Sequence, residues 1–117
     1  MMLESSFQAQ IVKFLRQRDA LVFNFIVNVY QRDIPDLYIA HKYWSGWLEL
    51  KTKNHQVTAG QRHNLTHLRR HNIKAYVVRE TKAGTIVLSN PAEDWSEAFL
   101  SFDDAWAWLT AATHETR

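Results

Sequence analysis

What the chain has little of limits the class of protein it can be. It has no cysteine, which excludes disulfides and thiolate metal ligands. Three glycines and two prolines among 117 residues are too few for a linker-rich or disordered chain. The longest apolar run, from Ala20 to Val29, is about ten residues and too short for a membrane span. Because the first ten residues are polar and lack a basic cluster, we expect no signal peptide and a soluble intracellular protein.

Apolar and aromatic side chains, in contrast, are abundant. Apolar residues make up 46% of the chain, with five Trp, six Phe and four Tyr. This length and composition predict a single domain over residues 1–117, with a core over about 4–90 and an extension over about 91–117.

Charge is unevenly distributed along the chain. Residues 1–90 hold 13 Lys/Arg and 6 Asp/Glu, whereas residues 91–117 hold 1 and 6. A basic body with an acidic extension favours a polyanion as the partner of the body. A chance partition of surface charge is the alternative.

Periodicity predicts a compact α/β or α+β domain with a mixed sheet. Phe7, Ile11, Phe14 and Leu15 recur at helical spacing and form one apolar stripe. Thr58 and Gln61 have the spacing of a helix-capping box, and Asn72 suits a left-handed helix end. The predicted order is a helix over 4–17, strands over 21–29, 36–40 and 47–52, a helix over 58–71, strands over 75–79 and 85–88, and a helix over 101–112.

Two short motifs carry the candidate chemistry: Ile34-Pro35-Asp36 and Glu49-Leu50-Lys51. Because strand side chains alternate in direction, Glu49 and Lys51 are expected on one face, about 7 Å apart. Asp36 could join them from a neighbouring strand. Two carboxylates and a backbone carbonyl suit Mg²⁺ or Mn²⁺, and Lys51 could orient a metal-bound water or offset charge on a phosphate. The alternative is a surface cross-strand ion pair.

Gln61 is expected to point toward the sheet, because it shares a helix face with Leu65 and Leu68. A polar amide in that position needs a partner, such as a phosphate or a metal-bound water. Completion of the capping box explains the residue equally well.

The order and spacing of these motifs resemble those of the PD-(D/E)XK nucleases. The resemblance covers about residues 4–80 and is closest to the virus-type replication-repair nuclease domains, small versions of which occur in phages. It implies a Mg²⁺-dependent DNA endonuclease on a restriction-endonuclease-like core, with Mn²⁺ as a substitute. It further implies a homodimer that acts on branched DNA such as four-way junctions, in the cytoplasm of a bacterial or phage-infected cell.

Residue roles follow from the same resemblance. Asp36, Glu49 and the main-chain carbonyl of Leu50 would bind the metal, with Glu4 of the first helix nearby. Lys51 would be the catalytic lysine and Gln61 an accessory catalytic residue. Two departures stand out: Asp33 occupies a position that is often glycine in the family, and the extension from Pro91 onward has no counterpart.

Other polar and aromatic residues have alternative interpretations. His63, His67 and His71 recur every four residues and could bind zinc, but a solvated or phosphate-facing surface is the better interpretation. Aromatic residues near Ser45 could stack on unpaired bases, although core or dimer packing is more common. The side chains expected to contact nucleic acid are Lys53, Asn54, Arg62, His63, Arg69 and Arg70.

Two rival functions remain open. One is a catalytically inactive DNA-binding or assembly module with the same fold. The other is a nuclease for flap, single-stranded or RNA substrates, which could use the same residues.

Overall fold

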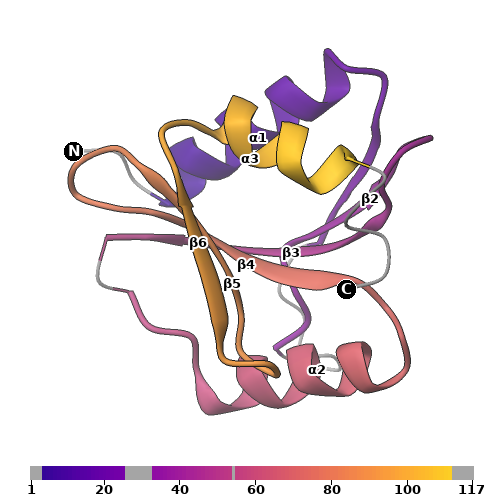
Figure 1. The fold of residues 1–117 in the computed structure, drawn as a ribbon, viewed down its shortest axis with the longest axis vertical. Helices are drawn as coiled ribbons and strands as arrows, with labels where there is room; N and C mark the ends of the chain where they lie inside the picture. The colour runs from indigo at the N-terminus through magenta and orange to yellow at the C-terminus, as the bar shows by residue number, and fades with distance from the viewer. Residues whose placement is uncertain (1–3, 26–32, 54, 112–117) are drawn as a thin grey trace.

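A computed structural model describes residues 4–25, 33–53 and 55–111, and of residues 4 and 5 it describes only the backbone. A six-stranded sheet lies between helices on both of its faces, which confirms the predicted α/β fold with a mixed sheet (Figure 1). The elements are α1 (Glu4–Arg16), β1 (Leu21–Asn24), β2 (Leu37–Ala40), β3 (Gly46–Thr52), α2 (Ala59–Arg70), β4 (Ala75–Glu80), β5 (Ile86–Asn90), β6 (Trp95–Phe99) and α3 (Phe102–Thr110). None of the helices in these ranges is long and apolar enough to cross a membrane.

The strands follow one another across the sheet in chain order, from β1 to β6. In this described sheet all neighbours are antiparallel except β3 and β4, which are parallel. A parallel pair needs a crossover connection, and α2 provides it. As a result, α2 covers one face of the sheet while α1 and α3 cover the other (Figure 1).

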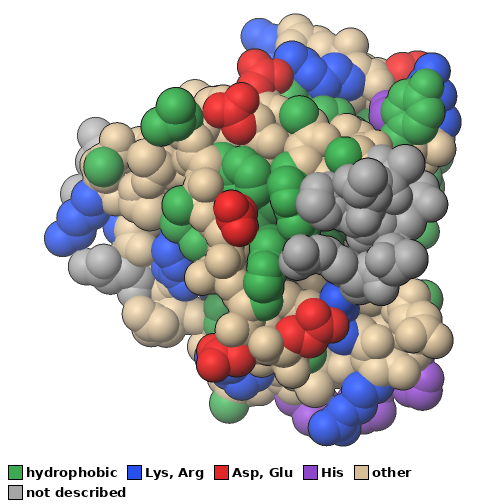
Figure 2. Space-filling model, in the orientation of Figure 1, with side chains coloured by type: hydrophobic (Ala, Val, Ile, Leu, Met, Phe, Trp, Pro, Cys, Tyr) green, Lys and Arg blue, Asp and Glu red, His purple; other side chains and the backbone are tan. Residues whose placement is uncertain are grey.

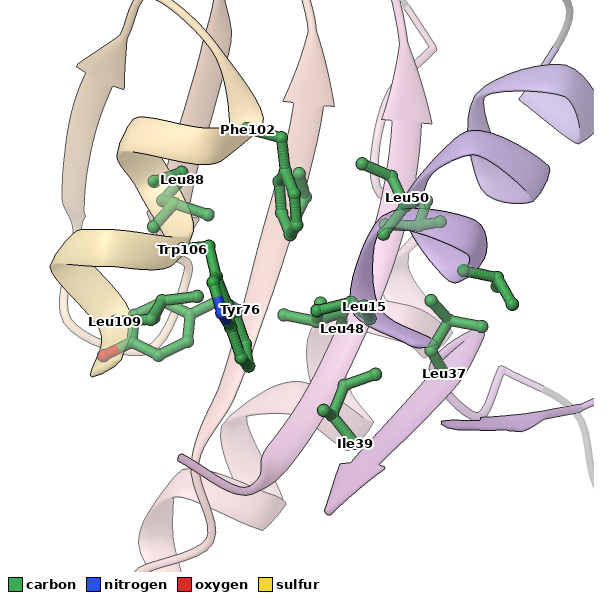
Figure 3. Packing of buried hydrophobic residues seen from close by; sticks show 14 of the residues in the cluster. Leu15, Leu37, Ile39, Leu48, Leu50, Tyr76, Leu88, Phe102, Trp106 and Leu109 are labelled. Atoms are coloured by element: carbon green, nitrogen blue, oxygen red, sulfur yellow. The ribbon is translucent and has the colours of Figure 1, made fainter. Parts of the chain in front are cut away.

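The main core lies between the sheet and the α1/α3 layer (Figure 3). The predicted stripe of α1 is confirmed, since Phe7, Ile11 and Leu15 are buried and Phe14 is packed against the cluster. From the sheet and α3 come the larger buried side chains, among them Leu37, Ile39, Leu48, Leu50, Tyr76, Leu88, Phe102, Trp106 and Leu109.

A smaller cluster lies between the sheet and α2. Leu65, Ala75 and Val77 form it, and Trp47 and Leu68 pack against its edge. The predicted capping box at Thr58 is present, and Asn72 has the expected positive φ, at 63°. The α2 face therefore has a small apolar centre, which leaves room on the same face for charged side chains.

The acidic extension contains one strand more than predicted. β6 was not predicted, yet it pairs with β5 and completes the sheet. Trp95 of β6 lies against Tyr76 of β4, with ring centroids 6.0 Å apart, so the extension packs against the body of its own chain. Most of the other predicted boundaries differ by one or two residues; for example, β2 begins at Leu37 rather than Asp36, and α3 ends at Thr110. Residues 26–29 of the first predicted strand and residue 112 of the last predicted helix lie outside the described residues.

Candidate functional site

Asp36 lies directly before β2 and is fixed to the neighbouring strand by its side chain. Its Oδ2 accepts a hydrogen bond from the backbone N–H of Leu50 at 2.8 Å. The pairing of Leu37 with Leu48, extended by one residue, places Asp36 opposite Glu49. Because the N–H and C=O of a strand residue point to the same side, the Leu50 carbonyl also points toward Asp36. Asp36 is thus hydrogen-bonded to β3 opposite Glu49, and the Leu50 carbonyl points to the same side of that strand.

Glu49 and Lys51 share the face of β3 that α2 covers, as predicted. The Lys51 Nζ lies 3.5 Å from Glu49 Oε2. Their relative exposures are only 2% for Glu49 and 7% for Lys51, which contradicts the alternative of a surface ion pair. Burial of an ion pair has a desolvation cost that often equals or exceeds its Coulomb gain, so stability alone is a weak reason for such a pair.

Gln61 completes the capping box of α2. Its Oε1 accepts the backbone N–H of Thr58 at 3.0 Å, and Thr58 Oγ1 accepts the backbone N–H of Gln61 at 3.1 Å. The cap uses only the oxygen of the Gln61 amide. A further role for its Nε2 in the site stays a prediction.

Asp33 stands where the PD-(D/E)XK nucleases often have glycine, and its backbone conformation is one that glycine favours. Its φ of 64° lies in the left-handed region, which glycine adopts freely and aspartate tolerates better than most residues. Its carboxylate lies against Gly60 in the first turn of α2, where the helix dipole favours an anion. Its main-chain carbonyl accepts a hydrogen bond from Asn64 Nδ2 at 3.0 Å. Asp33 therefore docks α2 onto the segment that leads to Asp36.

Arg79 belongs to the surroundings of the site and was not predicted. It is paired with Lys51 across the parallel β3–β4 ladder. Its Nη1 donates to the carbonyl oxygens of Lys53 at 3.1 Å and His55 at 2.5 Å. Arg79 therefore holds the chain that leaves β3, just beyond Lys51. The signal that could have revealed it is its register opposite Lys51, which needs the three-dimensional pairing.

The basic residues of α2 form two groups. Arg62, His63 and Arg70 are exposed, and Figure 2 shows basic and histidine side chains together over α2 at the lower right. Arg69 contradicts its prediction as a surface contact. Its side chain is 8% exposed and pairs with Glu93 at 2.9 Å, and its guanidinium lies over the ring of Tyr76. It packs α2 against the sheet instead.

Two predicted residues cannot be placed in the site. Asn54 and the side chain of Glu4 lie outside the described part of the chain. Lys53 is half-buried directly after β3, with a positive φ of 51°.

The oxygen donors at the site suit a hard divalent cation. Asp36 and Glu49 offer carboxylates, and the Leu50 carbonyl points to the same side. Mg²⁺ is commonly bound through one or two carboxylates, with water and phosphate oxygens in its other positions. Within the described ranges, no group of three or more His, Cys, Asp or Glu side chains could hold a metal.

Comparison with known proteins gives a structural neighbour. No protein-family model matches the chain, and no curated protein matches it. The fold is similar to the solved structure of Hjc from Archaeoglobus fulgidus, with a TM-score of 0.58 and 14% sequence identity over 74% of this chain and 76% of that one. That protein is a Holliday junction resolvase. At this identity the likeness to the resolvase shows the fold alone, and it confirms the predicted restriction-endonuclease-like architecture.

Proposed function

We propose that the chain is a Mg²⁺-dependent DNA endonuclease that is selective for branched DNA such as four-way junctions. The observation that carries the proposal is the hydrogen bond from the Leu50 N–H to Asp36, which joins one carboxylate to the strand that holds the buried Glu49–Lys51 pair. Membership of the PD-(D/E)XK nucleases, as a small virus-type replication-repair domain of a bacterial or phage-infected cell, belongs to the same proposal.

Each residue of the site has a distinct task. Asp36, Glu49 and the Leu50 carbonyl would hold Mg²⁺ (Mn²⁺ as a substitute), which supplies an acidified water and neutralises phosphate charge when bound. The Leu50 N–H keeps the Asp36 carboxylate oriented toward β3. Lys51 holds Glu49 in place and can donate to the attacking water or to a phosphate oxygen.

The surroundings support a nucleic-acid substrate. Arg62, His63 and Arg70 lie exposed along α2, and Lys53 follows the catalytic strand, so a phosphate backbone at the site would have basic residues close by. The resolvase fold supports branched DNA as the substrate.

A homodimer is part of the proposal. β1 forms an edge of the sheet, and Leu21, Phe23 and Phe25 project from one of its faces with exposures of 59%, 46% and 39%. An edge strand with exposed apolar side chains invites another chain to pair with it. Two copies related by a two-fold axis would present two sites, one for each cut of a symmetric junction.

The deciding experiment is a cleavage assay on linear duplex, single-stranded and four-way-junction DNA, with Mg²⁺, Mn²⁺ or EDTA. Asp36→Asn is the sharpest variant, because the amide oxygen can still accept from Leu50 while the charge is lost. Lys51→Ala tests the lysine, and Asp103→Asn, on the far side of the sheet, is the matched control.

We expect metal-dependent cleavage with a preference for the junction, lost in both site variants and unchanged in the control. Cleavage in EDTA, or by Asp36→Asn, would refute the mechanism. Binding of the junction without cleavage would favour the inactive module, and equal cleavage of the single strand or of an RNA version would favour the broader nuclease. A solution mass of one chain would refute the dimer.

A further inference from the structure

A groove runs between α2 and the Ile34–Pro35 segment, beside the proposed site. Its volume is about 450 Å³. This lies within the range of roughly 300–1,000 Å³ that is typical of small-molecule pockets. The groove is therefore large enough for one nucleobase with part of its sugar.

Most of the residues that line the groove carry rings, and Ile34, Asn64 and Leu68 complete the lining. Pro35 and Trp47 lie on the sheet side, and His63, His67 and His71 lie on successive turns of α2. The histidine ring centroids are 5.0 Å and 5.7 Å apart, so the three rings form one continuous row. Among the described residues, no Asp or Glu lines this groove. A flat aromatic ligand suits such walls.

The position of the groove ties it to the chemistry. Pro35 is the residue before Asp36, and Trp47 lies two residues before Glu49 on the same face of β3, about 7 Å away. A phosphate at the two carboxylates would thus have its adjoining nucleotide within reach of the groove. Exposed Arg70, on the same helix, offers a charge for a flanking phosphate.

Residues that line the groove are also held in place by further contacts. Trp47 packs against Phe25 and Tyr38, with ring centroids 5.2 Å and 5.1 Å away. The Asn64–Asp33 hydrogen bond joins α2 to the segment that forms the opposite wall. A preformed groove loses little conformational freedom when a ligand enters.

We propose that this groove seats one unstacked nucleobase of the substrate strand, next to the scissile phosphate. The inference rests on the proposed function and extends it, because it names a source of selectivity for branched DNA. Extraction of a base from a continuous duplex has an unstacking cost, which is smallest where bases are already unpaired or mismatched. A branch point interrupts the continuous stack, which lowers the cost of extracting a base beside it, so the groove favours branched over linear DNA.

The test is a binding measurement in EDTA, which needs no cleavage and excludes metal bridging between histidines. The probes are four-way junctions with an abasic position introduced at each nucleotide around the branch point in turn. The protein variants are His67→Ala and Trp47→Leu, with His55→Ala, an exposed histidine outside the groove, as the matched control.

For the wild type and His55→Ala, we expect one abasic position to weaken binding about tenfold, within the range of base–aromatic stacking. For His67→Ala the same position should have a much smaller effect, because the contact is already lost. A 2-aminopurine at that position should change fluorescence on binding the wild type and not His67→Ala. If Trp47→Leu unfolds at a temperature similar to that of the wild type, it should behave like His67→Ala. If Trp47→Leu unfolds at a lower temperature, the test depends on His67→Ala alone.

Two results would overturn the inference. One is that no abasic position weakens binding by the wild type. The other is that the full abasic effect persists in His67→Ala. Either result together with normal metal-dependent cleavage refutes the groove and leaves the proposed function standing. A positive groove result without cleavage refutes the nuclease and leaves base recognition standing.

Discussion

Replacement of Gln61 by glutamate separates the two roles that this side chain can have. In the structure the Gln61 Oε1 accepts the Thr58 N–H, and glutamate retains an oxygen in that position. Glutamate lacks the Nε2 donor, which is the only part of the amide that could serve the site. Gln61→Glu should therefore preserve the cap and impair the chemistry, whereas Gln61→Ala should impair both.

The expected stabilities follow from the number of cap hydrogen bonds lost. Gln61→Ala removes one, a loss of about 0.5–1.5 kcal/mol in the free energy of unfolding. Thr58→Ala removes the N-cap hydroxyl, at about 1 kcal/mol. For Gln61→Glu, the favourable helix dipole and repulsion from the Asp33 carboxylate at Gly60 oppose each other, so we expect a change within about 0.5 kcal/mol. Each kcal/mol lost should lower Tm by roughly 3–6 °C in a domain of this size.

The assay is thermal unfolding by circular dichroism in EDTA, followed by junction cleavage with Mg²⁺ well below Tm. We expect Gln61→Glu to unfold like the wild type and to cleave more slowly by on the order of a hundredfold, a typical effect of mispositioned reacting groups. Thr58→Ala should show the opposite pattern, with a lower Tm and nearly normal cleavage. If Gln61→Glu is as unstable as Gln61→Ala, the cap assignment is wrong. If Gln61→Glu cleaves normally, Gln61 is a capping residue and no more.

Three further predictions concern packing and DNA contacts. Gly60→Ala places a Cβ against the Asp33 carboxylate, and displacement of that exposed side chain should offset the helix-propensity gain of about 1 kcal/mol, so we expect little net change in urea unfolding; in an Asp33→Gly background the same substitution should show the full gain, and no difference between the two backgrounds would exclude the contact. Trp106→Ala should cost about 3–5 kcal/mol, since the ring is 6% exposed in the main core, whereas exposed Lys82→Ala should be neutral. Arg70→Gln should weaken DNA binding and reduce its salt dependence by about one phosphate contact, whereas Arg69→Gln should leave the salt dependence unchanged and lower Tm.

The parts of the fold that the sequence predicted are those with a strong local pattern. The apolar stripe of α1 and the Thr58 box determine their helices without help from distant residues. Alternation alone placed Glu49 and Lys51 on one face of β3, and the ion pair confirms it. These features depend on contacts between residues a few positions apart, so they can be predicted from a single sequence.

The missed features depend on distant pairing. β6 is an edge strand with mostly exposed side chains, and its order comes from pairing with β5 rather than from its own composition. Arg79 faces Lys51 only because β3 and β4 are parallel. Arg69 looks like any surface arginine of a basic helix until Glu93 and Tyr76 are placed beside it. The burial of the Glu49–Lys51 pair could not be predicted from the sequence either, because charged residues are mostly exposed.

The hydrogen bond from Leu50 to Asp36 gives the site an internal reporter. This amide proton donates to a carboxylate rather than to another strand. Its NMR chemical shift and its rate of exchange with solvent should therefore follow the state of one side chain rather than the stability of the sheet. A cation that engages Asp36, a substitution there, or a local opening of the segment before β2 would each be recorded by a single resonance. The same resonance can be followed while neighbouring amides of β3 serve as the internal reference.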